Sequence, residues 1–341
     1  MTGHDPARYK VALIGCGDIA KTGHLPAIMA HPRFELVALC DIRPERTARL
    51  ASLSGRKLPT YEDYRALLDR ERVDAVVLAL HPEHSVPVVV ECLRRGLAVL
   101  DEKPLACSLA DGRRVAEEIE ARRGVYQIGF CHRYNRWVQR VGDIARRIGT
   151  PALYCVRVYD ERLDRGNPDH FARIQQILAA SSAITHEASH VLDYFTSWNS
   201  SPWAQVQAMA TRTEAEFHGP NLWSAQFQCA DQSLLHVEIG WLLPDLPPSG
   251  AEIVGPRGRM ALSYAGSGVY YAAGKAETFS VPPYRQEWAR QLDVFAEAMD
   301  RGRATTATVQ DGLRALEASI ACETSLREGR TVEMGQAIQA P

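Results

Sequence analysis

The spacing of apolar residues along the chain changes near residue 131, and this change predicts two domains. Before this point, uninterrupted apolar runs alternate with segments that have the spacing of amphipathic helices. Such runs are typical of parallel strands buried on both faces, and their alternation with helices is typical of a doubly wound α/β sheet. We expect six strands, one ending at Gly15 and the others at residues 34–40, just before Tyr61, 73–80, 97–100 and 125–130. Helices are expected at residues 25–29, 44–52, 61–69, 84–95 and 108–123.

Beyond residue 131 the expected strands are longer, and apolar and polar positions alternate along them. This pattern predicts a C-terminal α/β domain with a large, open, mostly antiparallel sheet that carries helices on one face. The expected strands are 153–159, 204–213, 222–229, 234–241 and 251–254, and a helix is expected over 138–148. Two amphipathic segments, 288–300 and 312–327, are expected to cover this sheet or to return to the first domain. The predicted domains are residues 1–131 and 132–341.

The first predicted strand leads into the pattern Gly-x-Gly-x-x-Ala. The first glycine of such a turn permits the sharp bend, the second lets a pyrophosphate approach the backbone, and the small third residue lets helix and strand pack closely. The N-terminus of the following helix offers N–H groups and a positive dipole end to the anion. The pattern therefore indicates a Rossmann domain that binds a dinucleotide. The residues expected to contact it here are Gly15, Gly17, Asp18, Ile19 and Ala20.

Asp41 follows the second predicted strand, about twenty residues after Ala20, where the ribose-binding acid of a dinucleotide fold stands. Because a carboxylate repels a 2′-phosphate, we expect NAD as the cofactor. Arg43 and Arg46 stand nearby and can reverse this preference, so NADP remains a second candidate. In the alternative interpretation, Asp41 only caps the turn before Pro44.

Composition narrows the classes of function. The 341 residues carry a net charge of −2, which provides no general attraction to nucleic acid or anionic lipid. No apolar run reaches the roughly 18 residues of a membrane-spanning helix, and the N-terminus lacks the apolar core of a signal peptide. The eight cysteines form no Cys-x-x-Cys pair, which favours reduced thiols over a disulfide framework or a zinc ribbon. We therefore expect a cytoplasmic protein that binds a small molecule rather than nucleic acid or a membrane.

Candidate site residues follow the ends of the predicted strands. Ligands of parallel α/β sheets bind beyond the carboxyl ends of the strands, and His81, His84 and Lys103 lie just past such ends. Lys103 is the sharpest candidate, because it follows a buried strand and stands between Glu102 and Pro104. A lysine beside a nicotinamide and a substrate hydroxyl can donate or relay a proton. The alternative is an ordinary surface lysine after a strand.

A second candidate centre begins with the segment His186-Glu-Ala-Ser-His190. With helical spacing, His186 and His190 share one face, and Asp193 can orient the imidazole of His190. Alternatively, these are partly buried polar residues on a helix that packs against the sheet. The same five residues also spell HExxH, a two-histidine zinc site with a glutamate base. No third ligand follows at the spacing of the extended motif, so we expect no metal.

The glycine turn, Asp41, the Glu102-Lys103-Pro104 triplet and the histidine segment together resemble the Gfo/Idh/MocA oxidoreductases. The resemblance covers nearly the whole chain. It implies hydride exchange between a nicotinamide and a hydroxyl-bearing carbon of a sugar, polyol or related small molecule. It also implies a homodimer or homotetramer.

By position, the resemblance makes Lys103 and His190 the catalytic residues. It places His84 near the nicotinamide and turns Arg133 and Asn135 toward the active-site cleft. His186 and Ala188 stand where the family usually has an aspartate and a glycine, and His186 is expected to bind substrate. The full expected substrate set is Lys103, Arg133, His186, His190 and Asp193. The expected cofactor set adds Arg43, His81, His84, Glu102 and Lys103 to the glycine turn and Asp41.

Three other functions stay open. A lyase or NAD-dependent glycosidase of the same family would oxidise its substrate transiently, and the missing aspartate motivates this alternative. A zinc hydrolase would use the HEASH segment. A non-enzymatic NAD-binding sensor would keep the fold without turnover.

Overall fold

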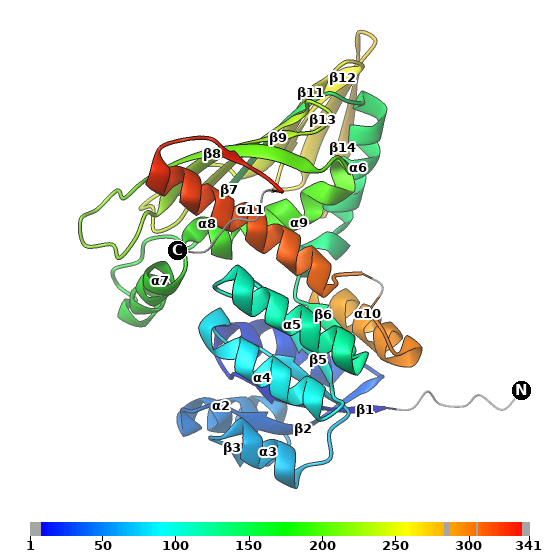
Figure 1. Ribbon diagram of the computed structural model, residues 1–341, viewed down its shortest axis with the longest axis vertical. Coiled ribbons are helices and arrows are strands. Elements are labelled where there is room, and N and C mark those ends of the chain that lie inside the picture. Colours follow the sequence, from blue (N-terminus) through cyan, green and yellow to red (C-terminus); the bar gives the residue numbers. More distant parts are fainter. Residues whose placement is uncertain (1–7, 283–286, 305, 336–341) are drawn as a thin grey trace, which may run out of the picture. The chain divides into compact units, whose positions relative to one another are not determined.

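The computed structural model describes residues 8–282, 287–304 and 306–335 (Figure 1). The chain divides into two compact units. The first comprises Met1–Cys131 with Gln286–Leu313, and the second comprises His132–Arg285 with Arg314–Pro341. Residues 286–313 therefore group with the first unit, although the sequence analysis assigned them to the second domain. The reason is that helix α10 (Trp288–Arg301) buries Leu292 and Phe295 in the core of the first unit.

The first unit is built on a six-stranded sheet in the order β3-β2-β1-β4-β5-β6. Every neighbouring pair in this sheet is parallel, as the continuous apolar runs predicted. The expected doubly wound sheet is thus confirmed. Its strands are β1 (Tyr9–Ile14), β2 (Phe34–Cys40), β3 (Thr60–Tyr61), β4 (Ala75–Leu78), β5 (Ala98–Asp101) and β6 (Tyr126–Ile128).

Capping side chains set several helix boundaries in the first unit. Asp63 accepts a hydrogen bond from the N–H of Arg65, so the helix expected from Tyr61 begins at Tyr64. Ser108 accepts from the N–H of Asp111 in the same way. Besides α10, this unit contains the π-helical turn η1 (Ala20–His24), α1 (Leu25–Ala30), α2 (Pro44–Ser54), α3 (Tyr64–Arg70), α4 (Pro82–Arg94) and α5 (Leu109–Arg122).

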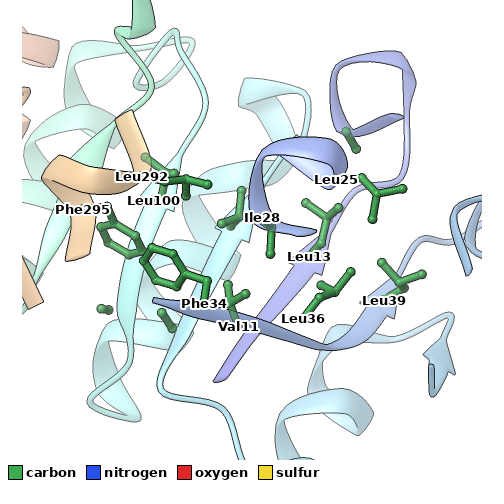
Figure 2. Close-up of a cluster of buried hydrophobic side chains, with 14 of the residues drawn as sticks. Val11, Leu13, Leu25, Ile28, Phe34, Leu36, Leu39, Leu100, Leu292 and Phe295 are labelled. Atoms are coloured by element: carbon green, nitrogen blue, oxygen red, sulfur yellow. The ribbon is translucent and has the colours of Figure 1, made fainter. Parts of the chain in front are cut away.

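The apolar core of the first unit lies between the sheet and the helices α1 and α10. Figure 2 shows Phe295 of α10 against Phe34 of β2, with Leu292 beside Leu100 of β5. The rings of Phe34 and Phe295 are stacked, with centroids 5.9 Å apart. The core of this unit therefore combines side chains from distant parts of the sequence, including α10.

The second unit contains a nine-stranded sheet in the order β14-β13-β12-β11-β7-β10-β9-β8-β15. Only β7 and β10 pair in parallel, so the expected large, mostly antiparallel sheet is confirmed. Its strands are β7 (Leu153–Tyr159), β8 (Trp203–Thr211), β9 (Leu222–Cys229), β10 (Leu234–Gly240), β11 (Gly250–Gly255), β12 (Gly258–Ser263), β13 (Ser267–Ala272), β14 (Lys275–Ser280) and β15 (Val332–Glu333).

Helices cover one face of this sheet. Helix α6 packs on β11 and β12, α8 packs on β9 and β10, and α9 packs on α6 and β10. The helices of this unit are α6 (Arg136–Ile148), α7 (Pro168–Ala180), α8 (Ala183–His186) and α9 (Ala188–Trp198). Two more, η2 (Cys131–Tyr134) and α11 (Val309–Glu328), begin in the first unit and end in the second. The strands β12 to β14 were not predicted from the sequence, and β14 has no buried position that would give it an alternation of apolar and polar residues.

Candidate functional site

The glycine turn lies directly after β1. Gly15 has a φ of +89°, and a Cβ placed there would lie 2.3 Å from the carbonyl oxygen of Ala79. The Cβ position of Gly17, in contrast, has no heavy atom within 4 Å. Asp18 and Ile19 are exposed, and buried Ala20 begins the π-helical turn η1. The turn is thus closed on the Gly15 side and open on the Gly17 side, where a bound group can approach the backbone.

Asp41 is buried at the end of β2 and is tied to the glycine turn. Its Oδ2 accepts the backbone N–H of Cys16 at 2.8 Å, and its Oδ1 accepts the N–H of Arg43 at 2.9 Å. The Nη1 atom of Arg46 lies 3.6 Å from Oδ2 of Asp41. Asp41, the predicted ribose-binding acid, therefore lies beside Arg46, which was predicted to favour NADP. The hydrogen bond from the N–H of Arg43 also agrees with the alternative interpretation, in which Asp41 caps the turn.

The Glu102-Lys103-Pro104 segment follows β5, and its glutamate turns back into the fold. Glu102 Oε1 accepts a hydrogen bond from His24 Nε2 at 2.8 Å, and Oε2 accepts the backbone N–H of Lys103 at 3.3 Å. Lys103 itself is half-buried. The sequence predicted Glu102 at the cofactor, whereas the structure gives its carboxylate these two intramolecular donors.

The last residue of β5, Asp101, is a buried carboxyl group. Its side chain accepts hydrogen bonds from the hydroxyl of Ser85 in α4 and from the hydroxyl of Tyr126 in β6, the latter at 3.1 Å. Burial raises the pKa of Asp101 to about 7, although both hydrogen bonds act to lower it. This cluster joins the start of α4 to the strand that leads to Lys103.

His81 and His84 flank the start of α4. His81 precedes the first residue of the helix and is partly buried, and burial lowers the pKa of its imidazole below the usual value. His84 is exposed, and its Nε2 lies 3.1 Å from Glu83 Oε1. Their ring centroids are 6.4 Å apart. Both residues thus lie past the carboxyl end of β4, as the sequence analysis predicted for cofactor-facing residues.

In the second unit, the predicted orienting residue Asp193 pairs with a guanidinium. Arg133 donates from Nε to Asp193 Oδ2 at 3.1 Å and from Nη2 to Oδ1, a bidentate pair in which Asp193 is buried. The ring of His190 packs edge-to-face on His132, with centroids 4.2 Å apart. Sequence reasoning did not single out His132, although it stands in the same GFCHRYNR stretch as Arg133. Asn135 of that stretch caps α6 by accepting the N–H of Trp137.

The HEASH segment does not form one continuous helix. Helix α8 ends at His186 and α9 begins at Ala188. His186 packs on Trp241, with ring centroids 5.3 Å apart. The described residues whose possible metal-ligand atoms lie close to those of His190 include His132, and they do not include His186 or Glu187. A zinc site of the HExxH type needs both histidines on one helical face, so the geometry of these described residues does not match it.

Lys103 belongs to the first unit and His190 to the second. Their meeting at one substrate stays a prediction. The expected substrate-binding residues other than Lys103 all lie in the second unit, and the expected cofactor-binding residues all lie in the first. Across the described residues, no helix has both the length and the apolar character needed to cross a bilayer.

Comparison with known proteins agrees with this division. Residues 9–130 match the profile of the family described as "Oxidoreductase family, NAD-binding Rossmann fold". The chain is 27% identical over 339 residues to inositol 2-dehydrogenase from Rubrobacter xylanophilus, covering 95% of this chain and 93% of that protein. It is 22% identical over 348 residues to scyllo-inositol 2-dehydrogenase (NAD(+)) from Bacillus subtilis, covering 96% of both.

A solved structure extends the comparison of folds to both units. It is an oxidoreductase from Agrobacterium radiobacter in complex with NAD+, L-tartaric acid and magnesium. The TM-score is 0.85 at 19% sequence identity, with 96% of this chain and 99% of that chain covered. At this identity the likeness concerns the fold. The nucleotide-binding unit thus matches the Gfo/Idh/MocA family of NAD-binding oxidoreductases over residues 9–130, and the chain as a whole is similar to full-length inositol 2-dehydrogenases.

Proposed function

We propose that this chain is an NAD-dependent dehydrogenase of a cyclic polyol related to the inositols. The match of residues 9–130 to an NAD-binding oxidoreductase family and the dehydrogenase relatives support the reaction class, which is hydride transfer between a nicotinamide and a hydroxyl-bearing carbon. The observation that carries the finer proposal is the alignment with inositol 2-dehydrogenases over more than nine-tenths of this chain. The substrate class of those relatives is the basis for the choice of a polyol.

The residues of the glycine turn fit a dinucleotide. The empty space at the Cβ position of Gly17 is the place where a pyrophosphate can approach the backbone. Asp41 lies next to this turn and can accept the ribose hydroxyls in addition to its backbone donors, because each carboxylate oxygen accepts more than one hydrogen bond. The carboxylate of Asp41 repels the 2′-phosphate of NADP, so we propose NAD as the principal cofactor. Arg46 lies beside Asp41 and can pair with that phosphate, so we propose NADP as a weaker cofactor.

Bound NAD supplies the hydride acceptor, and the side chains of the protein handle the proton. We assign uptake of the substrate hydroxyl proton to Lys103 Nζ, to the imidazole of His190, or to both in relay. His186 and the Arg133–Asp193 pair would hold the substrate hydroxyls, because a guanidinium held by a carboxylate presents its N–H groups in a fixed orientation.

The direct test is a panel of inositol isomers, other polyols and sugars, each with NAD and with NADP. Turnover is followed by the absorbance of the reduced nicotinamide. We expect one reduced cofactor per oxidised polyol and a loss of about 10²- to 10⁴-fold in kcat for Lys103→Ala. Conversion of substrate without net reduced cofactor would contradict a dehydrogenase and support a lyase or glycosidase. Full turnover by Lys103→Ala would remove the role assigned to Lys103.

We also propose a homodimer or homotetramer that forms through the sheet face opposite α6, α8 and α9. On this face, half-buried polar side chains pair across neighbouring strands, including Arg157 with Glu252 and Tyr159 with Glu238. A monomer by light scattering would contradict the proposal. A cytoplasmic location is supported by the eight cysteines, most of which are buried thiols. Cell fractionation tests it.

A further inference from the structure

The helix after the glycine turn starts in an unusual way. Residues Ala20–His24 form a π-helical turn, and an ordinary α-helix begins only at Leu25. Single π-turns are rare and are found frequently at functional sites. Here the turn ends at His24, whose side chain is only 1% exposed. Burying a polar imidazole costs free energy unless it is hydrogen-bonded. The partners of His24 therefore indicate the role of the π-helical turn.

The partner of His24 is the glutamate that precedes Lys103. His24 Nε2 donates to Glu102 Oε1 at 2.8 Å, and Glu102 Oε2 accepts the backbone N–H of Lys103 at 3.3 Å. Glu102 also packs against Gly129, where an added Cβ would lie 3.0 Å from its carboxylate. The carboxylate is therefore held between an imidazole, a glycine backbone and the amide of Lys103.

Helix α10 closes over His24 from the other side. The Trp288 ring lies edge-to-face on the imidazole, with centroids 5.5 Å apart at 67°. A Cβ at Gly23 would lie 2.4 Å from that indole, so the residue before His24 must be a glycine for the contact to exist. Water exclusion by the indole strengthens the imidazole–carboxylate hydrogen bond, because the local dielectric is low.

We propose that His24 is a positioning residue for Lys103. Its hydrogen bond fixes Glu102, which in turn holds the backbone of Lys103 from which the side chain extends. This inference rests on the proton-transfer role proposed above for Lys103. In this proposal, the π-helical turn and Trp288 affect the rate of the reaction by holding His24 in place. Neither of them is part of the glycine pattern or of the Glu-Lys-Pro triplet.

The test compares His24→Ala with His24→Gln and with a matched control. Glutamine places an amide N–H near the position of the histidine Nε2 and can still donate to Glu102. The control is His31→Ala, because His31 is also buried in the first unit and also pairs with an acid, with Nε2 3.1 Å from Asp293 Oδ1. In the described part of the chain, Asp293 pairs with His31 and Arg290. If His24→Ala does not fold, His24→Asn replaces it, because asparagine is too short to reach Glu102.

The readouts are kcat, the KM for substrate and the Kd for NAD by fluorescence titration. A misplaced catalytic group lowers kcat by about 10- to 100-fold, so we expect this loss for His24→Ala with little change in the Kd for NAD. His24→Gln should recover most of the rate. His31→Ala should keep the kcat of the wild type even where it lowers the melting temperature.

A double-mutant cycle separates this inference from the proposed function. In a Lys103→Ala background, adding His24→Ala should cost little further rate, because the two residues act through the same group. Additive losses, an unchanged kcat in folded His24→Ala, or an equal loss in His31→Ala would overturn the positioning role. If Lys103→Ala alone keeps full turnover, the proposed role of Lys103 fails independently of His24.

Discussion

The two glycines of the nucleotide turn are predicted to fail in different ways when each is replaced by alanine. Gly15 has a φ of +89°, and a Cβ there would lie 2.3 Å from the oxygen and 2.7 Å from the carbon of the Ala79 carbonyl. Both atoms are backbone, so the contact cannot be relieved by a change of rotamer. Gly17 has no such neighbour and no positive φ. Gly15→Ala should therefore damage the fold, whereas Gly17→Ala should leave it intact.

The magnitudes follow from these contacts. A left-handed backbone costs an alanine roughly 1–2 kcal/mol, and an overpacked contact adds roughly 1–3 kcal/mol. Gly15→Ala should thus lower the free energy of unfolding by about 2–5 kcal/mol in sum. Gly17→Ala should change it by less than about 0.5 kcal/mol, as substitutions in open space do. If a pyrophosphate approaches Gly17, the methyl group should raise the Kd for NAD by about tenfold or more, which is about 1.4 kcal/mol.

The assay is urea unfolding followed by circular dichroism, combined with fluorescence titration of NAD. Each variant serves as the control for the other, because both make the same chemical change within one turn. A Gly15→Ala protein as stable as the wild type would refute the steric argument. Unweakened NAD binding by Gly17→Ala would show that the pyrophosphate does not approach this side of the turn.

Three further predictions concern buried side chains. Phe295→Ala should lower the free energy of unfolding of the first unit by about 3–5 kcal/mol in urea, because it removes the ring stacked on Phe34; an unchanged midpoint would mean that α10 is not part of that core. Asp101 has its pKa raised to about 7, so the folded state keeps a proton that the unfolded state releases above about pH 4. The free energy of unfolding should therefore fall as pH rises from about 4 to 7, by on the order of 4 kcal/mol, and Asp101→Asn should flatten this slope in pH-dependent urea titrations. Arg133→Met should destabilise the second unit by about 3–5 kcal/mol, since it leaves the buried Asp193 carboxylate without its guanidinium; recovery in a double variant with Asp193→Asn would identify the lost pairing as the cause.

The positions of the main elements of the first unit could be predicted because they depend on local patterns. A strand buried on both faces must be apolar throughout, so β1, β2, β4 and β5 were recognisable without partners. A tight turn that brings its backbone against Ala79 must have glycine at position 15. Candidate residues past strand ends were also predictable, because parallel strands bring their carboxyl ends to one edge.

Contacts between distant segments could not be predicted in this way. The helical spacing of HEASH suggested one helix face, but the helix breaks at Glu187 and the two histidines pack on different rings. Asp193 stands three residues after His190, yet its carboxylate pairs with Arg133, which is sixty residues away. A sequence pattern shows which face of a helix is apolar, but it does not show which side chain forms an ion pair with a given charged residue.

The sequence by itself determined the two kinds of sheet and the nucleotide turn, since each depends on residue type at fixed short spacing. Only the tertiary structure decided that α10 completes the first unit, that Trp288 packs on His24 and that His24 bonds Glu102. These contacts join residues far apart in the chain. Their free energy comes from burial and hydrogen bonding that exist only after the intervening segments have folded.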